Sequence, residues 1–378
     1  MSTDFRIASE TAATQCSLWL KRRRTKSRGK SVVRSRPSTG SLVSRYPLFD
    51  RLAVRLSDLD ERQHLVQLAD CLSPGDSVPR YTHPDLAALA TAILEARRSG
   101  RPVILMMGAH VIKQGLSRYL VDLIERSLVT HVATNGAGII HDFELASIGA
   151  TSEDVARYIK GGEFGMWLET GELNDIAWEA YARNEGLGES VGRTIEELNF
   201  PNRDVSVCAA GYRKGVPVTS HVNIGADIVH AHPDCDGASW GDASYTDFLI
   251  FAQSISQLEG GVFLNVGSAV TGPEVYLKAL SMARNVARQR GETICHFTTA
   301  VFDLVELPAN FRDGHPPKTH PQYYYRPWKT ILIRTVADGG QSYYFQGDHR
   351  DTIPALHKAL TAPARLSQPG GTAAAIGK

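Results

Sequence analysis

The sequence has little cysteine and no long apolar run. Its five cysteines are an odd number among 378 residues and form no CxxC pair, so they predict reduced thiols rather than a disulfide framework. No stretch approaches the roughly 20 apolar residues of a membrane-spanning helix, and no apolar segment with a cleavage site resembles a secretory signal. We therefore expect a cytoplasmic protein without a membrane partner.

The sequence also lacks two common fingerprints of a cofactor or metal site. There is no GxGxxG motif, so a dinucleotide site must be argued from other turns. No standard zinc spacing occurs, although residues 221 to 236 contain several candidate ligands, among them His230, His232, Asp234 and Cys235. We favour polar residues satisfied within a loop over a metal there. A zinc-dependent hydrolase is the least favoured functional alternative.

The chain has little net charge, because 41 Lys and Arg nearly balance 40 Asp and Glu and leave +1, but the basic residues are unevenly spread. Residues 21 to 36 hold nine Lys and Arg and no acid. This arm lacks the interleaved aromatics of a nucleic-acid surface, and Asp4 and Glu10 oppose a transit peptide. We expect residues 1–45 to be a disordered basic arm, 46–362 a single domain, and 363–378 a flexible tail.

Apolar strands, glycine turns and helical segments alternate through the remaining chain. The expected strands are Val103 to Met107, Leu128 to Thr134, Val216 to Val222, Val262 to Val266, Thr293 to Ala300, Thr330 to Val336 and Tyr343 to Phe345. The expected helices are Asp50 to Leu72, Pro84 to Arg98, Ile112 to Ser127, Tyr245 to Leu258 and Val275 to Arg290. We expect the last two strands to form a hairpin. The pattern predicts an α/β fold, a doubly wound, mainly parallel sheet with helices on both faces, preceded by a helical N-terminal extension.

One strand leads directly into small residues and then into titratable ones. Thr134-Asn135-Gly136-Ala137-Gly138 ends the strand, and His141, Asp142 and Glu144 are expected in the first turn of the following helix. Small residues let backbone N–H groups approach a ligand, and the helix start adds partial positive charge. A plain tight turn is the alternative. Gly267-Ser268-Ala269 follows another strand and predicts main-chain donors for dinucleotide phosphates.

The order of these motifs resembles the deoxyhypusine synthase family over roughly residues 80 to 360. The resemblance lies in Gly108, Ile112 to Gly115, Thr134 to Gly138 with Asp142, Gly162 to Phe164, Asn174 to Ile176, Pro217 to Ser220, Asn265 to Val270, and Gly347 with Asp348. It implies an NAD-binding fold, a homotetramer, and transfer of an aminobutyl group from spermidine to a protein lysine. The expected cofactor residues are Gly108, Thr134, Asn135, Gly136, Ala137, Gly138, Asp142, Gly267, Ser268, Asp348 and His349, the last two being equally compatible with a helix cap.

The resemblance also implies an imine-forming lysine shortly after a tryptophan, for which Trp328-Lys329 is the counterpart. An amine must be neutral to attack, and burial beside an aromatic lowers a lysine pKa. A surface lysine at a strand start is the alternative. We expect His141 or His221 to move protons, because imidazole titrates near neutrality. The expected substrate contacts are Asp227, Glu274 and Trp328.

The segment before the tryptophan departs from the family, because Lys318, Arg326 and histidines replace the carboxylates that hold a polyamine. Basic residues repel a trication and suit an anionic or neutral substrate. We therefore expect an NAD-dependent enzyme that oxidises a small amine-type substrate or transfers its aminoalkyl group, with a protein lysine as acceptor in the latter case. The alternative is a nucleotide-binding regulatory protein without catalysis.

Overall fold

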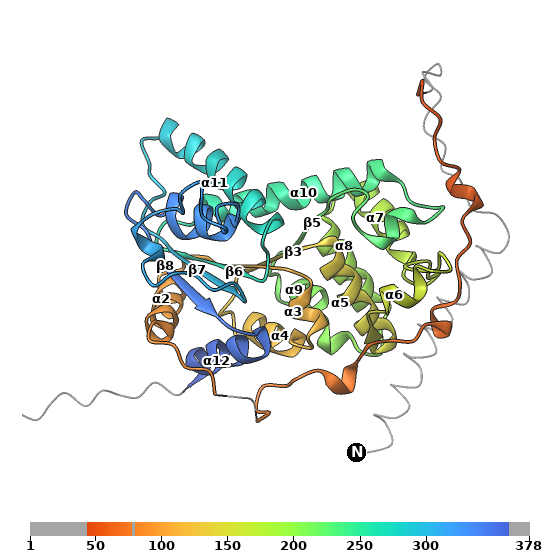
Figure 1. Ribbon diagram of the computed structural model, residues 1–378, viewed down its shortest axis with the longest axis horizontal. Coiled ribbons are helices and arrows are strands. Elements are labelled where there is room, and N and C mark those ends of the chain that lie inside the picture. The colour runs from red at the N-terminus through yellow and green to blue at the C-terminus, as the bar shows by residue number, and fades with distance from the viewer. Residues whose placement is uncertain (1–43, 78–79, 363–378) are drawn as a thin grey trace, which may run out of the picture.

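The computed structural model describes residues 44–77 and 80–362, so the predictions for the basic arm up to residue 43 and for the tail lie outside the described residues. A six-stranded sheet forms the centre of the molecule (Figure 1). Its strands are β2 (Val103–Met107), β3 (His131–Asn135), β5 (Val218–His221), β6 (Val262–Val266), β7 (Thr298–Asp303) and β8 (Gln341–Gln346). All neighbouring strands run parallel. The predicted α/β class and parallel sheet are confirmed.

The strand order is β5-β3-β2-β6-β7-β8. Numbered along the chain within this sheet, that order is 3-2-1-4-5-6, which is the doubly wound order of dinucleotide-binding folds. Every residue of β2 and β6 is buried, as expected for central strands covered on both faces. The chain changes its winding direction between these two strands, so ligands are expected beyond their carboxyl ends.

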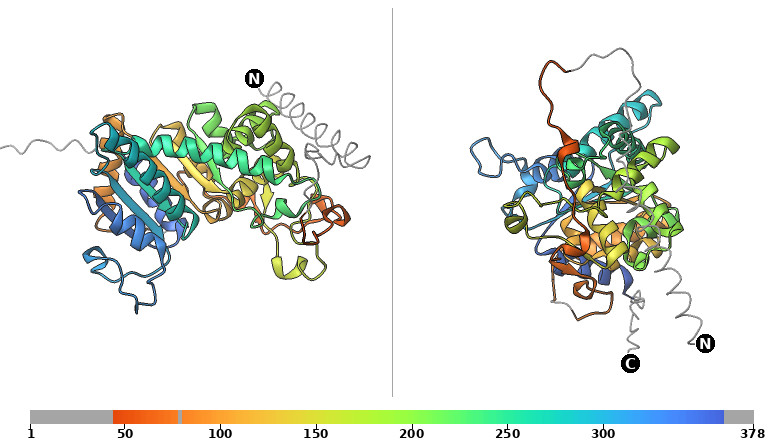
Figure 2. Two further views of the ribbon diagram at one scale, coloured as in Figure 1. Left: turned by 90° about the horizontal axis from the view of Figure 1, so that it is seen from above. Right: turned by 90° about the vertical axis from the view of Figure 1, so that its right-hand side faces the viewer.

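Helices cover both faces of the sheet, as predicted (Figures 1 and 2). One face packs against α2 (Leu86–Arg98), α3 (His110–Lys113), α4 (Ser117–Glu125), α5 (Gly136–Ile148), α8 (Leu187–Glu197), α9 (Val207–Lys214) and α12 (His349–Thr361). The other face packs against α10 (Gly237–Ser256), α11 (Thr271–Gln289) and the π-helix η7 (Pro327–Arg334). The helices α6 (Val155–Tyr158) and α7 (Glu172–Arg183) extend one end of the molecule.

The predicted helix over Asp50 to Leu72 is wrong. The leading segment, residues 44–77, contains three 3-10 turns and one short strand: η1 (Arg51–Ala53), η2 (Leu59–Glu61), β1 (Val66–Gln67) and η3 (Leu68–Asp70). Its backbone amides bond to distant parts of the chain: Ser57 to Met166 at 2.9 Å and Leu68 to Gly149 at 2.8 Å. β1 pairs antiparallel with β4 (Ala150–Thr151). Amides used in this way cannot close helical turns.

The predicted strand at Thr330 to Val336 and the hairpin after it are also wrong. That apolar run forms η7, whose Ile331 and Leu332 pack on the sheet. β8 then pairs with β7 in parallel, and a parallel neighbour needs a crossover rather than a tight turn. The predicted helix over Ile112 to Ser127 is divided into α3 and α4 by Gly115, which has a φ of 79°.

Candidate functional site at the carboxyl edge of the sheet

Two glycine turns meet at the point where the winding direction changes. Gly108 follows β2 and donates its N–H to the Val266 carbonyl at 2.9 Å. A Cβ atom at Gly108 would lie 2.3 Å from the carbonyl oxygen of Gly267, which follows β6. Only glycine permits this approach. The structure therefore brings together two of the turns that the sequence predicted as cofactor contacts.

The turn between β6 and α11 leaves main-chain donors free. Gly267 has a φ of 61°, and the Ser268 hydroxyl accepts the Gly272 N–H at 2.8 Å. Within the described residues, the amides of Ala269, Val270 and Thr271 donate no hydrogen bond, and Ala269 and Val270 are exposed. They begin a helix of 19 residues, so the helix dipole adds to their partial positive charge. This geometry suits an anion. We call residues 267–271 the cradle.

Several buried polar atoms near this edge have no hydrogen-bond partner among the described residues. They are Thr134 Oγ1 on β3, Ser220 Oγ on β5, Asn265 Oδ1 on β6 and His349 Nδ1 at the start of α12. Asn265 is fully buried, and its amide donates to the Ser268 carbonyl at 3.0 Å. Buried polar atoms are normally paired. The four that lie near this edge are therefore candidate contacts for a bound molecule.

His349 faces the cradle from α12. A Cβ atom on Gly267 would lie 2.4 Å from His349 Nε2, so the ring touches the turn. Burial lowers the pKa of His349, while Asp303 and Asp348 act to raise it and His110 to lower it. Asp348 caps α12 by accepting the Arg350 N–H at 2.8 Å, which is the capping alternative of the sequence analysis.

Asp303 and Tyr325 complete this surface, and sequence reasoning missed both. Asp303 ends β7 and accepts a hydrogen bond from the Tyr325 hydroxyl at 2.7 Å. A polar residue at the end of an apolar strand is a signal for such a site. The signal was hidden because the sequence analysis ended this strand at Ala300, three residues too early. His110, which begins α3 after Gly108, was missed as well.

The start of α5, in contrast, is already occupied by the protein. Asn135 Oδ1 accepts the Gly138 N–H at 2.9 Å, and Asp227 accepts the Ala137 N–H. A Cβ atom on Gly136 would lie 2.1 Å from Asp227 Oδ2. Burial raises the pKa of Asp227 to about 6. A carboxylate of the chain therefore lies where the sequence analysis placed a cofactor phosphate.

Asp142 binds the start of α9 rather than making the expected contact with the cofactor. Its carboxylate accepts hydrogen bonds from the Ser206 hydroxyl at 2.5 Å and from the amides of Val207 and Cys208 at 2.7 and 3.1 Å. It is 1% exposed and caps the start of α9. All of its strong interactions are therefore made within the protein.

The two histidines expected to move protons do not titrate near neutrality. Burial lowers the pKa of His141 to about 4, and one ring nitrogen bonds to Thr151 at 2.7 Å. Burial also lowers the pKa of His221 to about 3, beside the ring of Phe251. The expectation rested on the ordinary pKa of imidazole, which burial has changed.

Lys329 is the third residue of η7, a helix whose start lies near the cradle. Arg326 forms an ion pair with Glu274 in the first turn of α11, and Tyr325 bonds to Asp303, so η7 begins beside the ends of β6 and β7. Lys329 is 6% exposed, and its ammonium lies 3.6 Å from the centre of the Tyr323 ring.

The three expected substrate contacts have partners inside the protein. Trp328 donates its indole N–H to the Phe311 carbonyl at 2.9 Å. Glu274 pairs with Lys278 as well as with Arg326, and Asp227 lies at the start of α5. None of the three therefore presents a free group suited to a polyamine.

The histidine-rich segment contains the 3-10 helix η5 (Ile228–Ala231) and the turns on either side of it. His230 accepts the amides of Gly225 and Asp227 at 3.2 Å, and His232 bonds to the Gly165 carbonyl at 2.7 Å. In the part of the chain that the structure describes, no group of three or more His, Cys, Asp or Glu side chains is placed to hold a metal. Among the same residues, no helix is long and apolar enough to span a bilayer.

The sheet order and the site at its carboxyl edge define the class of protein, which is a doubly wound, Rossmann-like α/β fold. No protein-family model and no curated protein matches the sequence. Among solved structures, the chain is similar to AgrE in ternary complex with ornithine and NAD+, with 13% identity, a TM-score of 0.41, and coverage of 75% of this chain and 34% of that chain.

Two further structures show likenesses of the same order. An LOR/SDH protein from Methanococcus maripaludis S2 has 13% identity and a TM-score of 0.43 over 76% of this chain and 73% of that one. A structure from Entamoeba histolytica described as a deoxyhypusine synthase has 10% identity and a TM-score of 0.34 over 73% and 86%. The chain spans about a third of the AgrE chain.

Proposed function

We propose that this protein is an NAD-dependent enzyme that oxidises a small amine-type substrate, with the phosphates of the cofactor held at the cradle. The observation that carries this proposal is the free amide run of Ala269, Val270 and Thr271 at the point where the sheet changes its winding direction. Backbone donors at a helix start in this position suit a diphosphate.

The unpartnered buried atoms support the fit of a dinucleotide. Asn265 Oδ1 and His349 Nδ1 flank the cradle, while Thr134 Oγ1 lies two strands away on β3. Neighbouring strands are about 4.8 Å apart, so these groups are spread over roughly 10 Å. An extended dinucleotide spans such a distance. Bound NAD would supply the hydride acceptor.

The protein's own contribution to the reaction would be proton handling by His349. Oxidation of an amine to an imine releases a hydride and a proton, so a base is needed. Burial lowers the pKa of His349, which keeps its ring neutral and able to accept a proton. Asp303, held by the Tyr325 hydroxyl, then stabilises the protonated ring.

Aminoalkyl transfer is the finer form of this proposal, with Lys329 as the imine-forming amine. Its place in η7, shortly after Tyr325 and Arg326 contact the ends of β7 and the start of α11, supports this role. The pairing of Glu274 with two cations argues against spermidine as the donor. A monoamine or an amino acid requires fewer free carboxylates and is the substrate class that we favour.

The test places a negative charge in the cradle. Ala269→Asp adds a carboxylate at a helix start, where it suits the helix dipole but repels a phosphate. We expect NAD affinity, measured by calorimetry, to fall about tenfold or more, while the melting temperature is kept. Ala238→Asp, at the exposed start of α10, is the matched control and should bind NAD normally.

Turnover distinguishes the enzyme from a regulatory nucleotide-binding protein. The wild-type protein, NAD and a panel of amines and amino acids should give the absorbance of reduced nicotinamide with at least one substrate. Binding without turnover across the panel would favour the regulatory alternative. A wild-type protein that does not bind NAD at all contradicts the proposal.

A further inference from the structure

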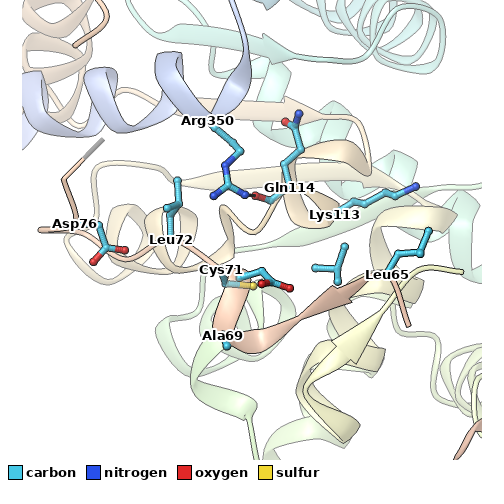
Figure 3. Close-up of a pocket in the computed structure, with 10 residues that line it drawn as sticks. Leu65, Ala69, Cys71, Leu72, Asp76, Lys113, Gln114 and Arg350 are labelled. Carbon is cyan, nitrogen blue, oxygen red and sulfur yellow. Dashed lines mark hydrogen bonds between the residues drawn. The ribbon is translucent and has the colours of Figure 1, made fainter. Parts of the chain in front are cut away.

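Apart from the cradle, a cavity lies between the leading segment, the end of α3 and the start of α12, and we call it the second cavity. It has a volume of about 580 Å³ and is bounded by residues of the leading segment, by the end of α3 and by the start of α12 (Figure 3). The leading segment is fixed over it: the Leu72 amide bonds to the Gly115 carbonyl at 2.9 Å, and Arg118 donates to the Cys71 carbonyl at 2.7 Å. The cavity is therefore part of the folded structure.

Two cations from different helices line this cavity without an anionic partner. Within the described residues, the Lys113 ammonium forms no ion pair and no hydrogen bond, and Arg350 forms no ion pair. Within the same residues, Arg350 makes one hydrogen bond, from Nη1 to the Gln114 carbonyl at 3.0 Å, which leaves most of its donors available. Figure 3 shows Arg350 extending from α12 towards Gln114 and Cys71. Both side chains are half-buried, which strengthens their attraction for an anion.

Two carboxylates also line the cavity, but they are engaged in the turns of the leading segment. Asp70 accepts the Gln67 amide at 2.8 Å, and Asp76 accepts the Ser73 amide at 2.6 Å. Both are exposed, so water screens their charge more strongly than that of the half-buried cations. They do not form ion pairs with Lys113 or Arg350 within the described residues.

We propose that this cavity binds a small metabolite that carries an anionic group, a carboxylate or a phosphate. Lys113 and the guanidinium of Arg350 hold the anionic group. Neither residue belongs to the cradle or to the other residues assigned to the dinucleotide. The inference therefore stands independently of the proposed reaction.

The experiment measures binding of two probes to the full chain by calorimetry, at constant ionic strength maintained with sodium chloride. Inorganic phosphate tests the phosphate form, and glycine tests a carboxylate beside an ammonium donor. We expect at least one probe to bind wild-type protein, and Lys113→Met and Arg350→Met each to weaken it by about tenfold or more. Arg98→Met, on the exposed end of α2, is the control and should bind as the wild type does.

The two probes and NAD separate the outcomes. Binding of phosphate alone assigns a phosphorylated ligand, and binding of glycine alone assigns a carboxylate. Because Lys113 makes no ion pair in the described chain, Lys113→Met should keep its fold even where Arg350→Met does not. If neither probe binds the wild-type protein, the inference is overturned. Unchanged probe binding by Lys113→Met overturns it as well. Displacement of the probe by NAD would likewise show that no separate site exists.

Discussion

At the scale of single residues, burial determines which titratable groups can act in chemistry. The carboxylate of Asp247 is fully buried in α10 and accepts amides of Ser220 at 2.8 Å and Gly188 at 3.1 Å. Burial nevertheless raises its pKa to about 8. The buried ring of His131 has its pKa lowered to about 3 for the same reason. Both side chains are therefore uncharged at neutral pH, and both are packed in the core.

The raised pKa of Asp247 leads us to predict how the free energy of unfolding depends on pH. The folded pKa of about 8 lies above the ordinary value of 3.8, so the folded protein keeps a proton that the unfolded chain has released. Stability should therefore fall as pH rises between these values, by up to about 1.4 kcal/mol per pH unit. Asp247→Asn should remove this part of the slope.

Urea unfolding between pH 5 and 8 is the measurement, and Asp242→Asn, an exposed position on the same helix, is the control. The control should follow the wild type over the whole range. If the free energies of unfolding of the wild type and of Asp247→Asn changed with pH in parallel, Asp247 would be ionised in the folded protein.

Lys329 gives a prediction on chemistry at the same scale. Lys329→Arg keeps a cation over the Tyr323 ring, but a guanidinium cannot form an imine. We expect loss of turnover and of borohydride trapping by mass spectrometry, with NAD affinity unchanged. Lys358→Arg, an exposed residue of α12, should retain both activities. Turnover by Lys329→Arg would remove imine formation from the proposal.

At the scale of elements, a buried ion pair joins the leading segment to the domain. Arg62 donates to both carboxylate oxygens of Glu144 at 2.9 and 2.7 Å, and both side chains are 1% exposed. Glu144 also accepts the hydroxyls of Thr151 and Thr170 at 2.6 Å. The carboxylate that the sequence placed in a ligand site thus anchors the segment that covers the second cavity.

Removing one member of this pair leaves the other charge buried. Arg62→Met should reduce the free energy of unfolding by about 3 to 5 kcal/mol, as measured by chemical denaturation. The double variant Arg62→Met with Glu144→Gln should recover part of the loss, because it removes the unpaired charge. Arg55→Met, on the exposed part of the leading segment, should have little effect. Equal stability of Arg62→Met and wild type would contradict the anchoring role.

At the scale of the whole molecule, the doubly wound order leaves one edge where all strands end. The cradle, Asp303 and His349 come from distant parts of the chain and share this edge because every strand of the sheet is parallel. Large apolar side chains remain exposed on two helices that pack together: Tyr245 and Leu249 on α10, and Met282 and Val286 on α11.

These exposed side chains predict self-association, in line with the homo-oligomer expected from the sequence. Residues four apart share one face of a helix, and apolar patches on a surface favour contact with another chain. Light scattering coupled to size exclusion should give a mass above that of one chain, and Leu249→Asp should lower it. Ile159→Asp, at an exposed position immediately after α6, is the control. A monomeric wild type contradicts the expectation.

Local patterns predicted much of this architecture. The strands β2 and β6 have the predicted bounds, because continuous apolar runs between turns form buried parallel strands. The helix α2 and the glycine turns after β2 and β6 were also predicted, because propensity and turn chemistry depend on neighbouring residues. The turn expected after β3 is wrong, because α5 begins at Gly136, which places His141, Asp142 and Glu144 beyond its first turn. The sequence by itself therefore determined the alternation of elements and the edge at which a site forms.

The tertiary structure alone decided which groups at that edge are free. Asp227 occupies the start of α5 and Asp142 that of α9, although each lies far along the chain from its partners. Burial changed the titration of His141 and His221, and long-range hydrogen bonds replaced the helix expected in the leading segment. These outcomes depend on desolvation and on contacts between distant residues, which no local pattern contains.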